Sequence, residues 1–272
     1  PLAVRSSSLV LAKPVRLPVL DGDLSIEQFA LDWSEVPPEI TFDGVLTPVS
    51  MEAVAAALGW IPMQGKLSGV IPRVALSKGS LSVGGNLLVR VFDGDIVLRN
   101  LGVSDVFGYW PVLTADLTCR NLALEMVTGT YEFGRITGRV DGVVDDLRLE
   151  NWRPVAFDAR FVTTPDDDSP HRISQRAIDN ITSLSGGAGG AVSRTLLRVF
   201  DDFGYRRLGI SCRLQNGVCE MDGVAPAKGG YYLVEGGGIP RIDVIGFNRS
   251  IDWNVLVDRL IAITESGPPT IE

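Results

Sequence analysis

The sequence has little of what most catalytic and metal sites require. His171 is the only histidine among the 272 residues, so a site built on two imidazoles, including the HExxH pattern of zinc peptidases, is excluded. The chain also contains no GxSxG nucleophile elbow and no Walker phosphate loop. We interpret His171 as a polar residue that opens a helix after Pro170. The sequence therefore predicts no enzyme, no metal site and no cofactor.

Carboxylates are plentiful, but their spacing does not define a site. Asp166–Asp168 could offer oxygen ligands to a divalent cation. The run lacks the alternation of a calcium-binding loop, and we interpret it as a solvated loop. The net charge is −8 and the isoelectric point is about 4.8. Because nucleic acids are bound through clustered lysine and arginine, this balance argues against a nucleic-acid partner.

Long apolar runs are missing as well. No stretch approaches the roughly 20 apolar residues that a membrane-spanning helix needs. Hydrophobic residues nevertheless make up 45% of the chain, and the mean hydropathy is +0.19. This apolar surface must be buried in a core, a groove or a partner. The first residues show neither an initiator methionine nor the order of a signal peptide, and we expect an interior point of a longer chain or a processed start.

Three cysteines are present, and two of them share a predicted hairpin. Cys212 and Cys219 flank Asn216-Gly217, which is a strong signal for a two-residue turn. That turn places Leu214 opposite Cys219, with Cys212 diagonally across on the same face. A disulfide requires a bulge or a longer loop that shifts the register; the alternative is two small buried residues. A disulfide would imply an oxidising compartment.

What the sequence does have is a succession of short alternating strands between Gly65 and Phe161, separated by glycine and Asp-Gly turns. Apolar and polar residues alternate along them, which is typical of an antiparallel meander with one apolar face. From the pattern alone, this face is either the inner wall of an open groove or an ordinary closed core. The residues expected to line the groove and contact lipid are Leu87, Val89, Val91, Ile96, Leu98, Leu117, Leu122, Leu124, Leu147, Leu149, Phe157 and Phe161.

The chain is expected to fall into three segments. Residues 1–64 hold N-terminal strands and a short helix, residues 65–165 hold the glycine-punctuated strands, and residues 166–272 hold two helices, hairpins and a C-terminal helix. The acidic, proline-bounded stretch Thr163–Pro170 separates the last two segments.

Helical periodicity is confined to a few places. Ser50 is expected to cap the short N-terminal helix, and Ser250 the C-terminal one. Apolar stripes at helical spacing predict the two central helices over Ile173–Leu184 and Val192–Phe203. Leu122–Met126, in contrast, alternates with a period of two, and we expect it to continue a strand.

Several stretches carry a resemblance to a known family. They are GKLSGVIPRVALSKGSLSVGGNLLVRVFDGDIVLRNLGV, ITGRVDGVVDDLRLENWRPVAFDARFVT, ISQRAIDNITSLSGG, CRLQNGVCEMDGV and GGIPRIDVIGFNRSIDWNVLVDRL. Their order resembles the C-terminal part of the YdbH-type proteins, which belong to the AsmA-like group that also includes TamB.

The resemblance implies a fold and a function. The fold is mainly β with a few helices, an open, twisted antiparallel sheet curled into a hydrophobic groove. The function is non-enzymatic: binding or transfer of phospholipid acyl chains in the periplasm, at the C-terminal part of an inner-membrane-anchored protein that reaches the outer membrane. A partner there, such as an outer-membrane lipoprotein or β-barrel protein, would add strands to an open edge.

Two other classes of function remain as alternatives. The first is a periplasmic interaction or assembly module that docks an outer-membrane partner by strand addition. The second is a secreted β-sandwich hydrolase that uses carboxylates, which would need a deep polar pocket with two facing acidic residues.

Overall fold

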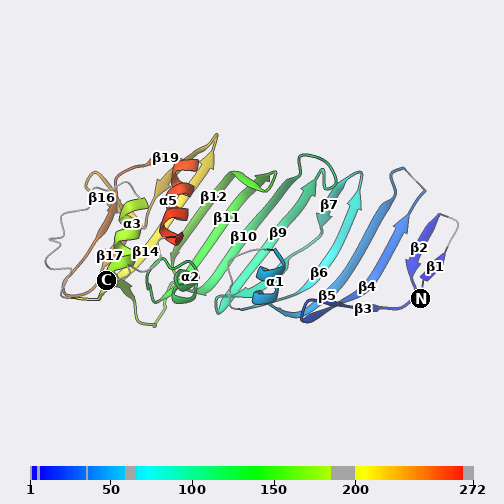
Figure 1. Ribbon diagram of the computed structural model, residues 1–272, viewed down its shortest axis with the longest axis horizontal. Coiled ribbons are helices and arrows are strands. Elements are labelled where there is room, and N and C mark those ends of the chain that lie inside the picture. Colours follow the sequence, from blue (N-terminus) through cyan, green and yellow to red (C-terminus); the bar gives the residue numbers. More distant parts are fainter. Residues whose placement is uncertain (1, 5–6, 35, 59–64, 185–199, 266–272) are drawn as a thin grey trace. The chain divides into compact units, whose positions relative to one another are not determined.

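The computed structural model describes residues 2–4, 7–34, 36–58, 65–184 and 200–265. The protein is mainly β, with antiparallel strand pairing and a few helices (Figure 1). It divides into two compact units. Unit 1 comprises Pro1–Cys119 and Val144–Ala156, and unit 2 comprises Arg120–Val143 and Phe157–Glu272. No described helix is both long and apolar enough to cross a membrane.

Unit 1 is built from strands that follow one another along the chain, with one helix among the described residues. Its elements are β1 (Leu2–Val4), β2 (Ser8–Leu11), β3 (Val15–Val19), β4 (Gly22–Asp32), β5 (Glu39–Ser50), α1 (Met51–Leu58), β6 (Gly65–Ser77), β7 (Ser80–Val83), β8 (Leu87–Val91) and β9 (Gly94–Ser104).

Three further strands contribute residues to both units: β10 (Val112–Ala123), β11 (Arg139–Glu150) and β12 (Arg153–Thr163). The remaining elements belong to unit 2. They are α2 (Leu124–Thr130), β13 (Arg172–Ser174), α3 (Gln175–Leu184), β14 (Asp202–Gln215), β15 (Val218–Asp222), β16 (Ala225–Ala227), β17 (Gly230–Gly236), β18 (Val244–Gly246), β19 (Ser250–Asp252) and α5 (Trp253–Glu265).

The sheet of unit 1 is an antiparallel meander. Strand β4 pairs with β2 and β3 on one side and with β5 on the other, β5 pairs with β6, and β6 pairs with β7 and β8. Both β7 and β8 pair with β9. Tight turns close the hairpins: Lys78 and Gly79, and likewise Phe92 and Asp93, take positive φ angles, the backbone shape of the turns that match strand twist.

Unit 2 packs strands and helices around a sealed core. Strand β14 pairs with β12, β13, β15 and β17 along its length. Helices α3 and α5 contact each other, and α3 also contacts β18 (Figure 1). Among the fully buried side chains are Phe203, Leu214 and Tyr231. The helix Ile173–Leu184 predicted from the sequence is found, beginning at Gln175.

Two cap predictions had different outcomes. The backbone N–H of Ala53 donates to the Ser50 hydroxyl over 3.2 Å, so Ser50 caps α1 as expected. The cap of α5 was expected at Ser250, and this is wrong. Ser250 lies in β19, and the Asp252 carboxylate accepts the N–H groups of Asn254 and Val255 at 2.9 and 3.1 Å. A side-chain acceptor directly before the first helical residue satisfies these otherwise unpaired donors.

Three other expectations need correction. Leu124 does not continue a strand but begins α2, where it and Thr128 are buried one helical turn apart; a short apolar run fits either period, and packing decides. His171 precedes β13 and does not open a helix. Phe203, expected on a second central helix, lies in β14. The rest of that predicted helix falls mostly on residues 185–199, outside the described residues.

Candidate functional site

The strand register of unit 1 places apolar residues in rows that run across the sheet. In one row, Leu9 lies opposite Leu31, and Leu31 opposite Ile40. The same row continues from Ile40 to Leu76 and Leu81, and ends at Val103. Because directly opposite residues of antiparallel strands project on the same side, six strands contribute one apolar residue each to a single face.

Parallel rows extend this face toward the other ends of the strands. Two rows are Phe29, Phe42, Val74 and Val83, and Val15, Ile26, Gly44 and Ile71. We call the whole set the apolar face of unit 1: Leu9, Val15, Leu17, Leu24, Ile26, Phe29, Leu31, Ile40, Phe42, Leu46, Leu67, Ile71, Val74, Leu76, Leu81, Val83, Leu87, Val89, Val91, Ile96, Leu98 and Val103.

The opposite face of the same strands carries their charged residues and many of their polar ones, together with apolar residues such as Val45, Val70 and Leu88. Lys66 lies opposite Arg90, which in turn lies opposite Asp95, and the Arg90 guanidinium is 3.5 Å from the Asp95 carboxylate. Thr41 and Ser25 project on this side as well. The sheet of unit 1 is therefore amphipathic, with a wet face and an apolar face.

Most side chains of the apolar face are half-buried; within this set Val74 and Val91 are buried and Leu17 is exposed. Neighbours in the sheet cover their flanks, but no second sheet among the described elements of unit 1 packs over them. Helix α1 contacts β5 and β6 and lies where Val49, Met51 and Ala55 are buried. The helix thus seals one end of the face and leaves the rest half-exposed.

The residues predicted to line a groove fall into two groups, one in each unit. In unit 1, Leu87 lies opposite Leu98 and Val89 opposite Ile96, with Val91 next along the same face of the β8–β9 hairpin. These five residues share the apolar face, as their alternation predicts. Whether that face curls into a groove stays a prediction.

Leu117 also belongs to unit 1, and a hydrogen bond fixes its side of the strand. The Arg99 guanidinium donates to the Thr118 hydroxyl over 2.7 Å, so Arg99 and Thr118 share the polar face. Their neighbours Leu98 and Leu117 therefore lie together on the apolar side. Leu147 and Leu149 are half-buried residues of β11.

The other predicted groove residues belong to unit 2 and have packing partners there. Leu122 and Leu124 are buried. The Phe157 ring meets the Trp253 indole edge to face, with ring centroids 5.3 Å apart. The Phe161 ring lies over Gly142, where any side chain would collide with it. Leu122 and Leu124 are therefore core residues, whereas Phe157 and Phe161 stay half-buried.

A network of polar residues stabilises irregular positions in the strands of unit 1. Asn100 and Asp146 take positive φ angles, which is uncommon for residues other than glycine. The Asp116 carboxylate accepts the Asn100 side-chain N–H at 2.6 Å and the Asp146 backbone N–H at 2.9 Å. The Asn100 hydrogen bond, followed by that of Asp146, lowers the pKa of Asp116. Asp116 therefore anchors both unusual positions.

His171 takes part in a compact cluster in unit 2. Its Nε2 lies 3.1 Å from the Asp167 carboxylate, and its ring stacks on Tyr205 with centroids 4.9 Å apart. Burial alone would raise the pKa of Asp167, but hydrogen bonds from Ser169, His171 and the backbone N–H of Arg139 lower it to about 2. Asp167 is thus a charged structural anchor for the segment between β12 and β13.

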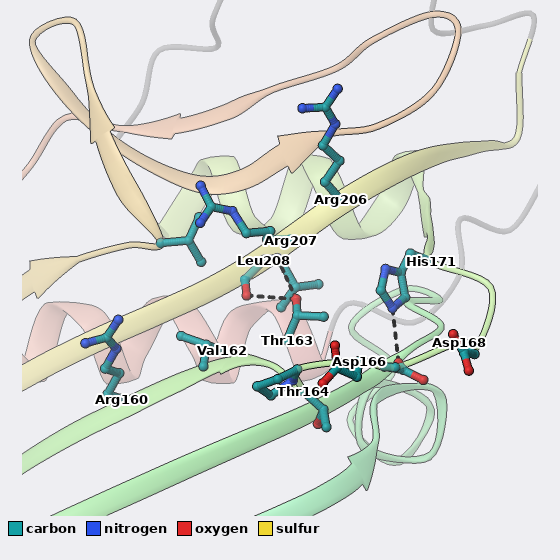
Figure 2. A pocket seen from close by; sticks show the side chains of 13 residues that line it. Arg160, Val162, Thr163, Thr164, Asp166, Asp168, His171, Arg206, Arg207 and Leu208 are labelled. Carbon is teal, nitrogen blue, oxygen red and sulfur yellow. Dashed lines mark hydrogen bonds and ion pairs between the residues drawn. The ribbon is translucent and has the colours of Figure 1, made fainter.

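An open hollow of about 450 Å³ lies beside this cluster (Figure 2). Arg160 from β12 and Arg206 and Arg207 from β14 line it together with Asp166 and Asp168. The Arg207 guanidinium is already paired with Glu235 at 2.8 Å. Apolar side chains, among them Val162, Leu208 and Val224, complete the wall, so the hollow combines charged and apolar groups.

The cysteine hairpin has the register that the Asn216-Gly217 turn predicts. Leu214 lies opposite Cys219 and Cys212 opposite Met221. The structure joins Cys212 and Cys219 by a disulfide across this diagonal, with Cα atoms 5.5 Å apart and no register shift between the strands. The third cysteine, Cys119, is buried. Among the described residues, no group of three His, Cys, Asp or Glu side chains has an arrangement that could hold a metal ion.

Sequence reasoning missed most of the apolar face, because only Leu87, Val89, Val91, Ile96 and Leu98 of that face were among the residues predicted to line a groove. Residues 1–60 read as generic strands, yet Leu24, Ile26, Phe29, Ile40 and Phe42 belong to the same face as the β8–β9 hairpin. Alternation was visible in this stretch, as in LSIEQFALD. What was missing was the register that joins these strands to β6.

In comparisons with known proteins, no family model, curated protein or solved structure matches the chain. The functional argument therefore rests on the geometry of the site.

Proposed function

We propose that this chain is a non-enzymatic lipid-binding segment that holds and passes phospholipid acyl chains along the apolar face of unit 1. One observation carries the proposal. The register aligns apolar residues from β2 to β9 on one face, and most of them are half-buried with no second sheet of unit 1 described over them.

An acyl chain is a physically suitable cover for such a face. Burying a methylene group contributes about 0.8 kcal/mol, so an aliphatic chain gains affinity along its whole length without specific polar contacts. The rows of leucine, isoleucine, valine and phenylalanine provide this contact, and the polar face keeps Lys66, Arg90 and Asp95 in water. The surface fits the tail of a lipid and imposes no requirement on its headgroup.

The disulfide supports placing this activity in the periplasm. Disulfides persist in oxidising compartments such as the bacterial periplasm and are rare in the cytosol. The Cys212–Cys219 bond lies in a hairpin of unit 2, and the proposed setting is a periplasm-spanning protein that moves phospholipid between the inner and outer membranes.

The test is native mass spectrometry of the purified chain, with extraction of the bound lipid, on two matched variants. Val89→Asp places a carboxylate on the apolar face, opposite Ile96. Leu88→Asp places the same group one residue away on the polar face, opposite Val97. Both positions are half-buried, so the side of the sheet is the main difference between them.

We expect co-purified phospholipid on the unmodified chain and on Leu88→Asp, and its loss from Val89→Asp at unchanged circular dichroism. Equal lipid on both variants would contradict the proposal. Absence of lipid from the unmodified chain, together with capture of a protein through the sheet edge, would replace lipid binding by the assembly module.

A further inference from the structure

The exposed aromatic residues of unit 1 gather at one edge of its sheet, in the loops where its strands begin or end. Among the described aromatic side chains of this unit, Phe29 and Phe42 are half-buried and Phe92 is buried. Trp33, Phe107, Tyr109, Trp110 and Trp152 are exposed by 41%, 82%, 102%, 58% and 64%. We call these five residues the aromatic edge.

The strand register shows that these five residues lie at the same end of the sheet. Trp33 directly follows β4. The last residue of β4, Asp32, pairs with the first residue of β5, Glu39, and the next residue of β5, Ile40, pairs with Leu76 near the end of β6. Strand β6 turns into β7 just beyond Leu76, and the Val106 N–H donates to the Gly79 carbonyl in that turn over 2.9 Å. The loop after β9 therefore lies beside the β6–β7 turn, at the edge that holds Trp33.

Hydrogen bonds hold the loop residues 105–111 against the turn between β11 and β12. The Asn151 N–H donates to the Pro111 carbonyl over 2.9 Å, and the Trp110 indole N–H to the Glu150 carboxylate over 3.4 Å. Trp152 is thereby brought next to the loop that carries the other three rings. All of these residues belong to unit 1.

The loop has a defined shape that presents its rings to solvent. The Asp105 carboxylate accepts the Trp110 backbone N–H at 3.0 Å and occupies the space beside Gly108 where a side chain would otherwise lie. Holding large aromatic rings in water is unfavourable. An ordered loop that does so along one edge has the properties of a binding surface.

We propose that the aromatic edge inserts into the headgroup region of a lipid bilayer. Tryptophan and tyrosine have an apolar body and a polar tip, and they favour the membrane–water interface. The rings stand on several separate turns along one sheet edge. A fluid bilayer accommodates such a row of protruding side chains, whereas a protein partner must offer matching pockets over a specific interface of about 800 Å².

Continuity with the apolar face adds a second reason. The strands that end at this edge include β9 and β10, which carry Ile96, Leu98 and Leu117. An acyl chain that leaves the bilayer at the aromatic edge would therefore meet the apolar face directly. This link rests on the proposed lipid binding, but bilayer insertion itself does not require it.

The experiment is co-sedimentation of the full chain with phosphatidylcholine vesicles and, in parallel, with vesicles that contain phosphatidylglycerol. The variant is Phe107→Ser with Tyr109→Ser, two rings for which no side-chain hydrogen bond is found. We expect about tenfold or greater loss of partitioning. The control is Ile239→Ser with Phe247→Ser, which removes apolar side chains exposed by 101% and 45% in unit 2, and we expect it to partition like the unmodified chain.

A second measurement is independent of the serine variants. Lipids brominated near the headgroup should quench the fluorescence of a chain that keeps Trp110 and Trp152 while its other tryptophans are replaced by phenylalanine. The proposal would be overturned if the lipids did not quench this fluorescence, or if the serine variant partitioned like the unmodified chain. It would also be overturned if the chain bound a protein but did not bind vesicles. Val89→Asp separates the two proposals, because it should lose co-purified lipid yet still sediment with vesicles.

Discussion

The two units have similar lengths but bury their apolar residues very differently. Among the described residues, eight of the buried hydrophobic side chains lie in unit 1 and 21 in unit 2. Unit 2 covers its strands with α3 and α5 and encloses Phe203, Tyr231 and Val234 almost completely. Among the described residues of unit 1, the apolar face is covered mainly by its neighbours in the same sheet.

This difference separates a core from a surface. Alternation along a strand produces an apolar face in either case, and only the presence of a second layer turns that face into a core. In unit 2, elements of the unit itself provide this second layer. Among the described residues of unit 1, α1 covers the apolar face at one end, and the half-buried remainder could be covered by an occupant from outside the unit.

The largest expected effect contrasts equal substitutions in the two units. Phe203→Ala should lower the free energy of unfolding of unit 2 by about 3–5 kcal/mol, because it opens a cavity in a sealed core. Phe42→Ala should cost unit 1 only about 1–2 kcal/mol in the lipid-free protein, because the Phe42 ring is already half-exposed. Urea unfolding followed by amide hydrogen exchange in each unit measures both. Equal costs would mean that the apolar face is sealed.

A second prediction concerns the charged anchor of unit 2. Asp167→Asn should destabilise this unit by about 2 kcal/mol, the equivalent of lowering a carboxyl pKa by nearly two units. Because the folded-state pKa of about 2 lies below the unfolded value, this stability is complete above about pH 4 and is lost as the pH falls toward 2. Thermal unfolding between pH 2 and 6 tests it, with the exposed neighbour Asp168→Asn as the control expected to change little.

The sequence predicted the type of fold because strand alternation is a local signal. The turn at Asn216-Gly217, the helix over Gln175–Leu184 and the common face of the β8–β9 hairpin all follow from residues close together in the chain. Leu124 shows where this fails, because its short apolar run fits a helix or a strand. Packing against the rest of unit 2, which the sequence does not display, made it a helix.

The extent of the candidate site could not be predicted for a related reason. The rows from Leu9 to Val103 depend on strand register, and β-bulges shift that register between Ile26 and Gln28 and between Phe42 and Gly44. A shift of one residue moves a side chain to the other face. The aromatic edge depends on which loops share an end of the sheet, although the run FGYWP was visible in the sequence.

Lipid removal should sharpen the contrast between the units. If acyl chains cover the apolar face, delipidation should speed amide exchange in β4, β5, β6 and the β8–β9 hairpin, because a ligand stabilises only the structure that binds it. Amide exchange in β14, β15 and β17 should stay the same, because helices and strands of unit 2 itself cover that core. Hydrogen exchange with and without detergent extraction measures this. A uniform change in both units would show that lipid acts on the protein as a whole.

The smallest expected effects concern the helix caps, where the two units should behave alike. Ser50→Ala in unit 1 and Asp252→Ala in unit 2 should each cost about 1 kcal/mol, because each removes the acceptor of the first helical N–H groups. Ser250→Ala should cost less than about 0.5 kcal/mol, because Ser250 lies in β19 and is exposed. Thermal unfolding of the three variants tests this. Similar costs in both units would mean that local structure is equally stable in the two, and that unit 1 differs in its uncovered apolar face. A much larger cost for Ser50→Ala would instead show that α1 is the principal cover of that face.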